Sequence, residues 1–350
     1  MTEKGCFHEL AEISGMGHSK AMHKLLECAM TEDEARLILE LPASNEDLAA
    51  KFNMSKEEVD EKLYNLAQRG IVAPLESGSF HFNQVPAILH DNMFSSTPEN
   101  IPDGLDKAWL EMYDGEKYWR DLAEMYDGFE APILRVIPAE KSISTDIKLL
   151  PQESITKIIE TNQDMISVRN CCCRNSAKKC HHPLNVCIQF KARAEYDLYR
   201  GSGRKVSADE AVSVALTGVG AGLIPTVTNI SVIENLEFIC LCCGCACLVL
   251  EPALKGNIIP KVLSPSRFEA KINNELCNGC RHCVPRCQVG ALDMKPIPGH
   301  STIKAVLDPD KCVGCGVCDL ACVPGAITME LVRPPEFIPE SIADEQIVHL

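Results

Sequence analysis

Apolar positions in the first quarter of the chain recur at helical spacing. Residues 55–66 combine an N-terminal capping box with an apolar stripe on one helix face. Two further helix patterns precede this segment, and residues 71–82 suit two short strands joined by a turn. The order of three helices and a hairpin predicts a winged-helix-like module within residues 1–95.

The middle of the chain alternates between strand-like and helix-like patterns. Two strands are predicted at 166–170 and 236–241, and three helices at 152–162, 184–199 and 207–216. A glycine-rich stretch, 218–222, is expected to form the loop after the last of these helices. Both strands run directly into groups of cysteines, so the two groups could meet at one site. We therefore predict a central α/β cysteine-rich domain over residues 151–270, preceded by a connector with aromatic helices at 96–150.

The chain holds 20 cysteines, which are distributed unevenly. Five lie in 171–187, five in 240–247 and eight in 277–322. The N-terminal sequence lacks the apolar region of a secretory signal, and no apolar run reaches the roughly 20 residues that a spanning helix needs. These features predict a cytoplasmic protein without a membrane span, in which clustered thiols are more often metal ligands than disulfides.

The charge of the chain argues against nucleic acid as a partner. Lys and Arg total 34 against 49 Asp and Glu, a formal charge of −15. The third helix of the N-terminal module, which would enter a DNA groove, carries Glu57, Glu58, Asp60 and Glu61. Phosphates would repel these carboxylates. A structural or docking role is therefore predicted for the module.

Two segments near the C-terminus share the spacing C-x2-C-x2-C-x3-C. The first runs from Cys277 to Cys287 and the second from Cys312 to Cys322. Three thiolates in a tight loop can hold three corners of an iron–sulfur cube, and in paired arrangements the last cysteine of each segment ligates the other cluster. Zinc ribbons use separated C-x2-C pairs, so zinc fits these triple runs poorly.

This part of the chain, residues 271–331, resembles the bacterial two-cluster [4Fe–4S] ferredoxins. The resemblance implies two clusters, one held by Cys277, Cys280, Cys283 and Cys322, the other by Cys312, Cys315, Cys318 and Cys287. One feature departs from the family pattern, in which proline directly follows the fourth cysteine. Here Gln288 follows Cys287, and Pro324 comes one residue late. Residues 332–350 are expected to form a C-terminal tail.

Ten further cysteines lie in the central domain. Alternate cysteines on a strand face the same side, and adjacent thiols share a larger cluster more easily than one small ion. We predict a further metal centre there, either iron–sulfur or zinc, with a redox dithiol as the remaining alternative. The predicted ligands are Cys171, Cys173, Cys180, Cys187, Cys240, Cys242 and Cys243, while Cys172, Cys245 and Cys247 match the pattern less well.

Residues 130–331 also resemble a group of long proteins from anaerobes, in which a central cysteine-rich domain precedes a dicluster ferredoxin. The motifs Cys171-x-Cys173-Arg174, His182-Pro183 and Gly203-Arg204 carry this likeness. It implies iron–sulfur redox chemistry in strict anaerobes but no particular substrate.

Together these features predict an α+β multidomain protein with three possible functions. The favoured hypothesis is an electron-transfer protein that passes single electrons through two [4Fe–4S] clusters, between a central metal centre and a redox partner or larger oxidoreductase complex. The main alternative is an iron–sulfur oxidoreductase whose central cysteine site is catalytic. The third is a redox-responsive winged-helix regulator. No catalytic residue can be assigned from the sequence.

Overall fold

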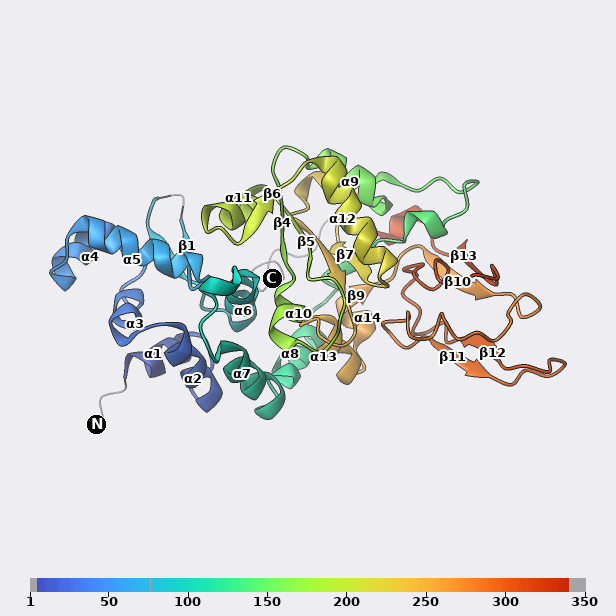
Figure 1. Cartoon of the computed structure of the whole chain (residues 1–350), viewed down its shortest axis with the longest axis horizontal. Helices are drawn as coiled ribbons and strands as arrows, with labels where there is room; N and C mark the ends of the chain where they lie inside the picture. The colour runs from blue at the N-terminus through green and yellow to red at the C-terminus, as the bar shows by residue number, and fades with distance from the viewer. Residues whose placement is uncertain (1–4, 76, 340–350) are drawn as a thin grey trace.

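The computed structural model describes residues 5–75 and 77–339. Along the long axis of the molecule, N-terminal helices lie at one end, a seven-stranded sheet occupies the middle and two small sheets lie at the other end (Figure 1). Mixed helices and strands agree with the predicted α+β class. Among the described helices, none has both the length and the apolar character required to cross a membrane. The predicted tail from residue 340 onward lies outside the described residues.

The N-terminal region follows the predicted order of elements. It comprises α1 (Cys6–Ile13), α2 (Lys20–Ala29), α3 (Glu32–Ile38), α4 (Asn45–Phe52), α5 (Lys56–Gln68), β1 (Val72–Pro74) and β2 (Phe80–Phe82). Capping boxes at Thr31 and Ser55 begin α3 and α5. The two strands pair antiparallel, with Val72 opposite Phe82. Membership of the winged-helix class remains a prediction.

The predicted connector forms helices that pack aromatic rings against the rest of the molecule. The predicted N-terminal module ends with α6 (Pro86–Ser95), and the connector itself holds a 3-10 turn (Pro98–Asn100), α7 (Leu105–Leu110), a π-helix (Glu111–Gly115) and α8 (Tyr118–Asp127). Trp109 is buried, with its ring centroid 4.1 Å from that of His90. The Tyr126 hydroxyl donates to the carbonyl of Leu248 over 3.4 Å. The connector is therefore packed against the central domain.

The central sheet has the strand order β6-β4-β5-β8-β7-β3-β9. Its strands are β3 (Leu134–Val136), β4 (Ile166–Asn170), β5 (Asn185–Phe190), β6 (Gly203–Lys205), β7 (Ile224–Thr228), β8 (Phe238–Cys242) and β9 (Leu263–Ser264). Only the pair β3–β9 is parallel among these neighbours, so the sheet is not the parallel sheet of an α/β domain. The accompanying helices are α9 (Ile155–Thr161), α10 (Cys172–Ala177), α11 (Lys191–Tyr199), α12 (Ala208–Gly220), α13 (Leu250–Lys255) and α14 (Ile259–Val262).

Two details of the predicted central domain are wrong. Residues 184–199 do not form one helix but strand β5 followed by α11, because β5 inserts between β4 and β8 and buries its side chains on both faces. The glycine-rich loop is also misplaced, since Gly218 and Gly220 lie within α12. A Cβ on Gly218 would lie 2.3 Å from Leu241 Cδ1, so glycine there permits the helix to approach the sheet closely.

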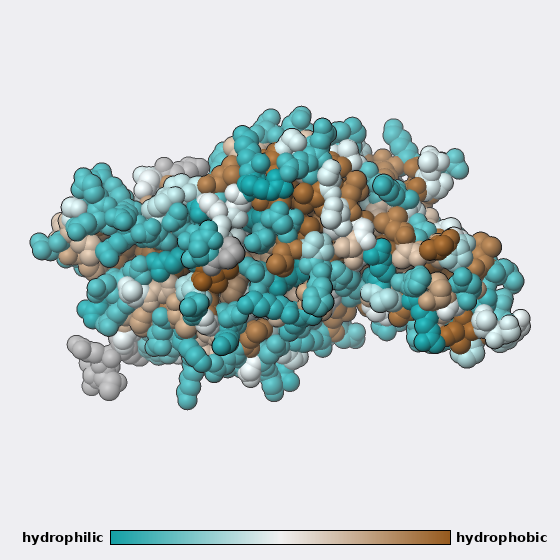
Figure 2. Space-filling model, viewed as in Figure 1, coloured by the Kyte–Doolittle hydropathy of each residue, from teal (hydrophilic) through white to brown (hydrophobic). Residues whose placement is uncertain are grey.

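The C-terminal region consists of two antiparallel ribbons. Strand β10 (Phe268–Ile272) pairs with β13 (Ile327–Leu331), and β11 (Leu292–Lys295) pairs with β12 (Lys304–Leu307). One cysteine segment lies between β10 and β11 and the other between β12 and β13. In Figure 2 the visible face is largely hydrophilic, and hydrophobic residues appear in small groups over the central and C-terminal parts.

Candidate metal centres

The eight C-terminal cysteines form two separate groups in space. The outer set, Cys277, Cys280, Cys283 and Cys322, lines one small cavity. The inner set, Cys287, Cys312, Cys315 and Cys318, lines a second one. Each set draws three cysteines from one segment and the fourth from the other. This grouping is the one that the ferredoxin resemblance implies.

Backbone amides point at the sulfurs of both sets. Ala291 N–H donates to Cys287 Sγ over 3.1 Å, and Ala326 N–H donates to Cys322 Sγ over 3.2 Å, each from four residues further along the chain. Such donors stabilise negative charge on cluster sulfurs. Burial raises the pKa of Cys315 to about 12, which disfavours a free thiolate unless a metal is bound. The residues therefore fit an iron–sulfur cluster in each set.

The inner set lies against the central domain. Ala139 N–H donates to the Cys315 carbonyl over 2.9 Å, and Ser266 N–H donates to the Val313 carbonyl over 3.0 Å. A Cβ on Gly316 would lie 2.1 Å from Ser142 Oγ, so the loop passes directly over that segment. In contrast, Cys280 of the outer set is exposed. The inner set therefore lies at the junction with the central domain, and the outer set includes one exposed cysteine.

The departure at Gln288 is explained by this junction. The Gln288 amide donates to the Gly222 carbonyl over 3.0 Å and accepts from Gly244 N–H over 2.9 Å. Beside it, Arg286 donates to the Gly220 carbonyl over 2.7 Å. Proline has no side-chain donor or acceptor and could not form these two hydrogen bonds. Glutamine here joins the C-terminal cysteine segment to the central domain.

Residues 276–326 match the family model described as a 4Fe-4S dicluster domain. This part of the chain is a 4Fe–4S dicluster domain. The match and the cysteine content indicate iron–sulfur electron transfer as the broad function. Neither the curated proteins nor the solved structures include a match to the chain. The wider resemblance to cysteine-rich proteins of anaerobes remains a prediction.

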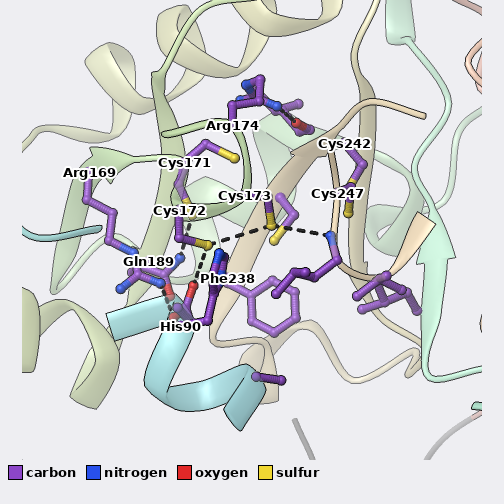
Figure 3. Close-up of a pocket in the computed structure, with 18 of the residues that line it drawn as sticks. His90, Arg169, Cys171, Cys172, Cys173, Arg174, Gln189, Phe238, Cys242 and Cys247 are labelled. Atoms are coloured by element: carbon purple, nitrogen blue, oxygen red, sulfur yellow. Dashed lines mark hydrogen bonds and ion pairs between the residues drawn. The ribbon is translucent and has the colours of Figure 1, made fainter. Parts of the chain in front are cut away.

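A second cysteine-rich feature is a cavity of about 140 Å³ in the central domain. Its thiols come from the segment after β4, from β5, from β8 and from the turn after β8. They are Cys171, Cys172, Cys173, Cys187, Cys240, Cys242 and Cys247. In Figure 3, Cys173 lies between Cys172 on one side and the neighbouring Cys242 and Cys247 on the other. Antiparallel pairing of β5 with both β4 and β8 brings these distant segments together.

The thiols of this cavity contact one another. The Sγ atoms of Cys172 and Cys173 are 3.7 Å apart, and those of Cys242 and Cys247 are 3.4 Å apart. The hydrogen bond with Cys240 lowers the pKa of Cys187 to about 7, although burial opposes this shift. A set of buried thiols that share protons can lose them together to a bound metal. The arrangement fits a polynuclear metal centre better than isolated thiols.

Charged groups surround the cavity. Buried Arg169 forms ion pairs with Asp91 over 2.5 Å and with Asp197 over 3.1 Å. Cys172 Sγ donates to Asp91 Oδ1 over 2.9 Å. The hydrogen bond with Cys173 lowers the pKa of Cys172, but burial and Asp91 outweigh it and raise the pKa to about 12. Cys172 is therefore held as a neutral thiol by its carboxylate neighbour in the metal-free chain.

Helices α6 and α8 contribute four residues to the cavity lining without any signal in the sequence. Ala87, His90 and Asp91 come from α6 and Tyr126 from α8. Burial lowers the pKa of His90 to about 3, and its Nε2 lies 2.8 Å from Ser176 Oγ. No motif or spacing in α6 or α8 marks these positions, because they reach the cavity only through the packing of the helices on the central domain.

The predicted central ligands do not form one set. Cys171, Cys173, Cys187, Cys240 and Cys242 line the cavity, together with Cys172 and Cys247. Cys180 and Cys243 instead lie with Cys245, and all three Sγ atoms are within 4.8 Å of one another. We call these three residues the thiol triad. The central domain therefore presents two groups of thiols.

Proposed function

We propose that the protein carries single electrons between a redox partner and a metal centre in the cysteine-lined cavity, by way of the dicluster domain. The supporting observation is the placement of the two cysteine sets, with the inner set against the central domain and one cysteine of the outer set, Cys280, exposed to solvent. When bound, [4Fe–4S] clusters supply one-electron storage at potentials tuned by their surroundings. Each residue described below holds or positions such a centre.

The outer set offers a surface for a partner. Leu276 and Val323, adjacent to Cys277 and Cys322, are 51% and 89% exposed. Val323 occupies the position at which ferredoxins carry proline. Exposed apolar side chains beside an exposed ligand such as Cys280 are typical of a surface that a protein partner covers. Electrons would enter or leave at this end.

The inner set is held firmly at the domain junction. A Cβ on Gly244 would lie 2.3 Å from the Gln288 carbonyl oxygen, which shows how closely the two backbones approach. Gln288 and Arg286 add side-chain hydrogen bonds across the same contact. Close and rigid contact keeps the inner site at a fixed separation from the central thiols. Such fixed separation suits intramolecular electron transfer.

The cavity residues would hold the acceptor centre. Arg169, Arg174 and Arg193 line the cavity and offset the charge of several thiolates. Leu248 N–H donates to Cys173 Sγ over 3.4 Å, and Gln189 Nε2 donates to Cys187 Sγ over 3.0 Å. These donors resemble the amides at the dicluster sulfurs in chemistry. The cavity thus provides thiolates, cations and hydrogen-bond donors for an iron–sulfur centre.

A second candidate function is an oxidoreductase that reacts at this cavity. Two buried polar atoms at the cavity, Arg169 Nε and Gln189 Oε1, have no hydrogen-bond partner within the described residues. Unsatisfied buried polar groups are costly unless a ligand or water completes them. These features favour a small polar substrate beside the metal centre.

The electron-transfer proposal is tested on the full chain purified without oxygen. Iron, sulfide and electron paramagnetic resonance signals are compared among wild type, Cys312→Ser, Cys242→Ser and Cys28→Ser as the control. We expect about eight irons from the dicluster domain plus further iron that Cys242→Ser alone removes. After mixing with reduced viologen, the cavity signal should appear more slowly in Cys312→Ser. Wild-type protein with about eight irons or fewer would contradict the central centre.

A further inference from the structure

We propose that Cys180, Cys243 and Cys245 bind a single tetrahedral metal ion of the Zn²⁺ type, at a site separate from the cysteine-lined cavity. This inference goes beyond the electron-transfer proposal and does not depend on it. The sequence had placed Cys180 and Cys243 in one ligand set with the cavity cysteines, and the structure separates them.

The spacing of the sulfurs favours one ion. All three Sγ atoms lie within 4.8 Å of one another. Zn–S bonds of about 2.3 Å in a tetrahedron place two sulfurs about 3.8 Å apart, so the triad needs shifts of only about 1 Å. A cubane spreads its thiolates further, because each of them binds a different iron.

The dicluster cysteines provide an internal comparison for this spacing. Across residues 5–75 and 77–339, the triad is the only group of three or more Cys, His, Asp or Glu whose ligand atoms meet the 4.8 Å limit. The outer and inner sets, which match the dicluster family, do not meet it. The triad is therefore more compact than the cluster-binding sets of the same chain.

The segments that carry the triad have no regular structure of their own to hold them together. Cys180 lies in the loop between α10 and β5, while Cys243 and Cys245 lie in the turn after β8. Cys243 is fully buried, and Cys180 and Cys245 are partly buried. An ion bound by all three would link this loop to the turn, next to the Gly244 contact with Gln288. The site would therefore also stabilise the junction with the dicluster domain.

Arg174 supplies the charge that such a site requires. Three thiolates and Zn²⁺ carry a net charge of −1. The Arg174 guanidinium, 3% exposed, donates to the Pro183 carbonyl over 3.1 Å and to the Leu241 carbonyl over 2.7 Å. It thus bridges the same two segments that carry the triad. Its Nη2 has no hydrogen-bond partner among the described residues, although it is buried.

Within the described part of the chain, this group contributes three ligands rather than four. His182 follows Cys180 by two residues but does not belong to the 4.8 Å group. The fourth tetrahedral position is therefore left for water or another small ligand. Closed structural zinc sites have four protein ligands, whereas sites with three keep an exchangeable position. The triad belongs to the second kind.

The test measures zinc, iron and sulfide in full-length protein purified without oxygen. Wild type and the control Cys6→Ser, a cysteine of α1, should each hold about one zinc per chain. Cys245→Ser and, independently, Cys180→Ser should lower zinc at least about tenfold while leaving iron and sulfide unchanged. Using two variants guards against a local folding defect in either one.

X-ray absorption at the zinc edge gives a second readout. We expect three sulfurs at about 2.3 Å and one lighter ligand in wild type. Wild type without zinc would overturn the proposal, as would variants that lose iron and sulfide instead, because the triad would then belong to a cluster. A preparation that lacks iron but retains triad-dependent zinc would contradict only the electron-transfer proposal.

Discussion

The ion pair between Arg267 and Glu153 gives the sharpest test of how the dicluster domain is joined to the rest of the chain. Arg267 lies just before β10, and Glu153 ends the 3-10 turn at Pro151–Glu153. Both nitrogen–oxygen distances of this two-pronged contact are 2.7 Å, and the side chains are 4% and 2% exposed. Replacing Arg267 by methionine would remove the cation that forms both of these hydrogen bonds with the buried carboxylate.

The expected cost follows from that burial. After Arg267→Met, the Glu153 carboxylate keeps the N–H of Leu150, 3.0 Å away, but loses both charged donors. Breaking one side of a buried pair costs about 3–5 kcal/mol. The double variant Arg267→Met, Glu153→Gln should cost less than the sum of the two single changes, because it leaves no charge unpaired.

The measurement is urea unfolding of the anaerobic holoprotein, followed by far-ultraviolet circular dichroism and by visible absorbance. We expect the midpoint of Arg267→Met to fall by at least about 1 M. Lys157→Met is the matched control, since Lys157 and Glu160 form a pair 2.7 Å apart with 61% and 48% exposure. Its effect should stay within about 1 kcal/mol. Equal midpoints for the two methionine variants would refute the reasoning.

Two further predictions concern backbone strain and pH. Gly314→Ala should disrupt the inner set, because Gly314 has φ +68° and an added Cβ would lie 2.1 Å from the Phe268 carbonyl oxygen. Gly290→Ala is the control, since Gly290 has φ +66° but open space around its Cβ position. This control variant should lower the free energy of unfolding by only about 1–2 kcal/mol. Retention of full iron by Gly314→Ala would contradict this. In the folded chain the pKa of His90 is lowered from 6.5 to about 3, so the unfolded chain binds a proton at this imidazole more tightly than the folded chain does. The free energy of unfolding therefore falls as the pH drops below 6.5. Replacing His90 by phenylalanine should reduce the slope of unfolding free energy between pH 6 and 5 by about 1 kcal/mol per unit, measured by urea unfolding at each pH. An unchanged slope would show that His90 is not the group responsible.

The sequence by itself determined the dicluster domain, because its ligands lie in two short segments of fixed spacing. Local spacing of three cysteines sets the loop geometry, and the fourth cysteine that lines each cavity comes from the paired segment. Helices that begin at a capping box, such as α5 with Ser55 as its N-cap, were also predicted, because a capping box is a local sequence pattern. The departure at Gln288 was visible in the sequence, but its hydrogen bonds to Gly222 and Gly244 were not.

Tertiary structure alone decided how the ten central cysteines divide. Strand β5 lies between β4 and β8, a pairing that the helix predicted over 184–199 had hidden. Cys242 and Cys243 are adjacent in sequence, yet one lines the cavity and the other joins the triad, since successive residues of an extended chain point to opposite sides. His90 and Asp91 reach the cavity through helix packing. Contacts between residues far apart in sequence leave no local pattern, so only the folded chain shows which thiols share a site.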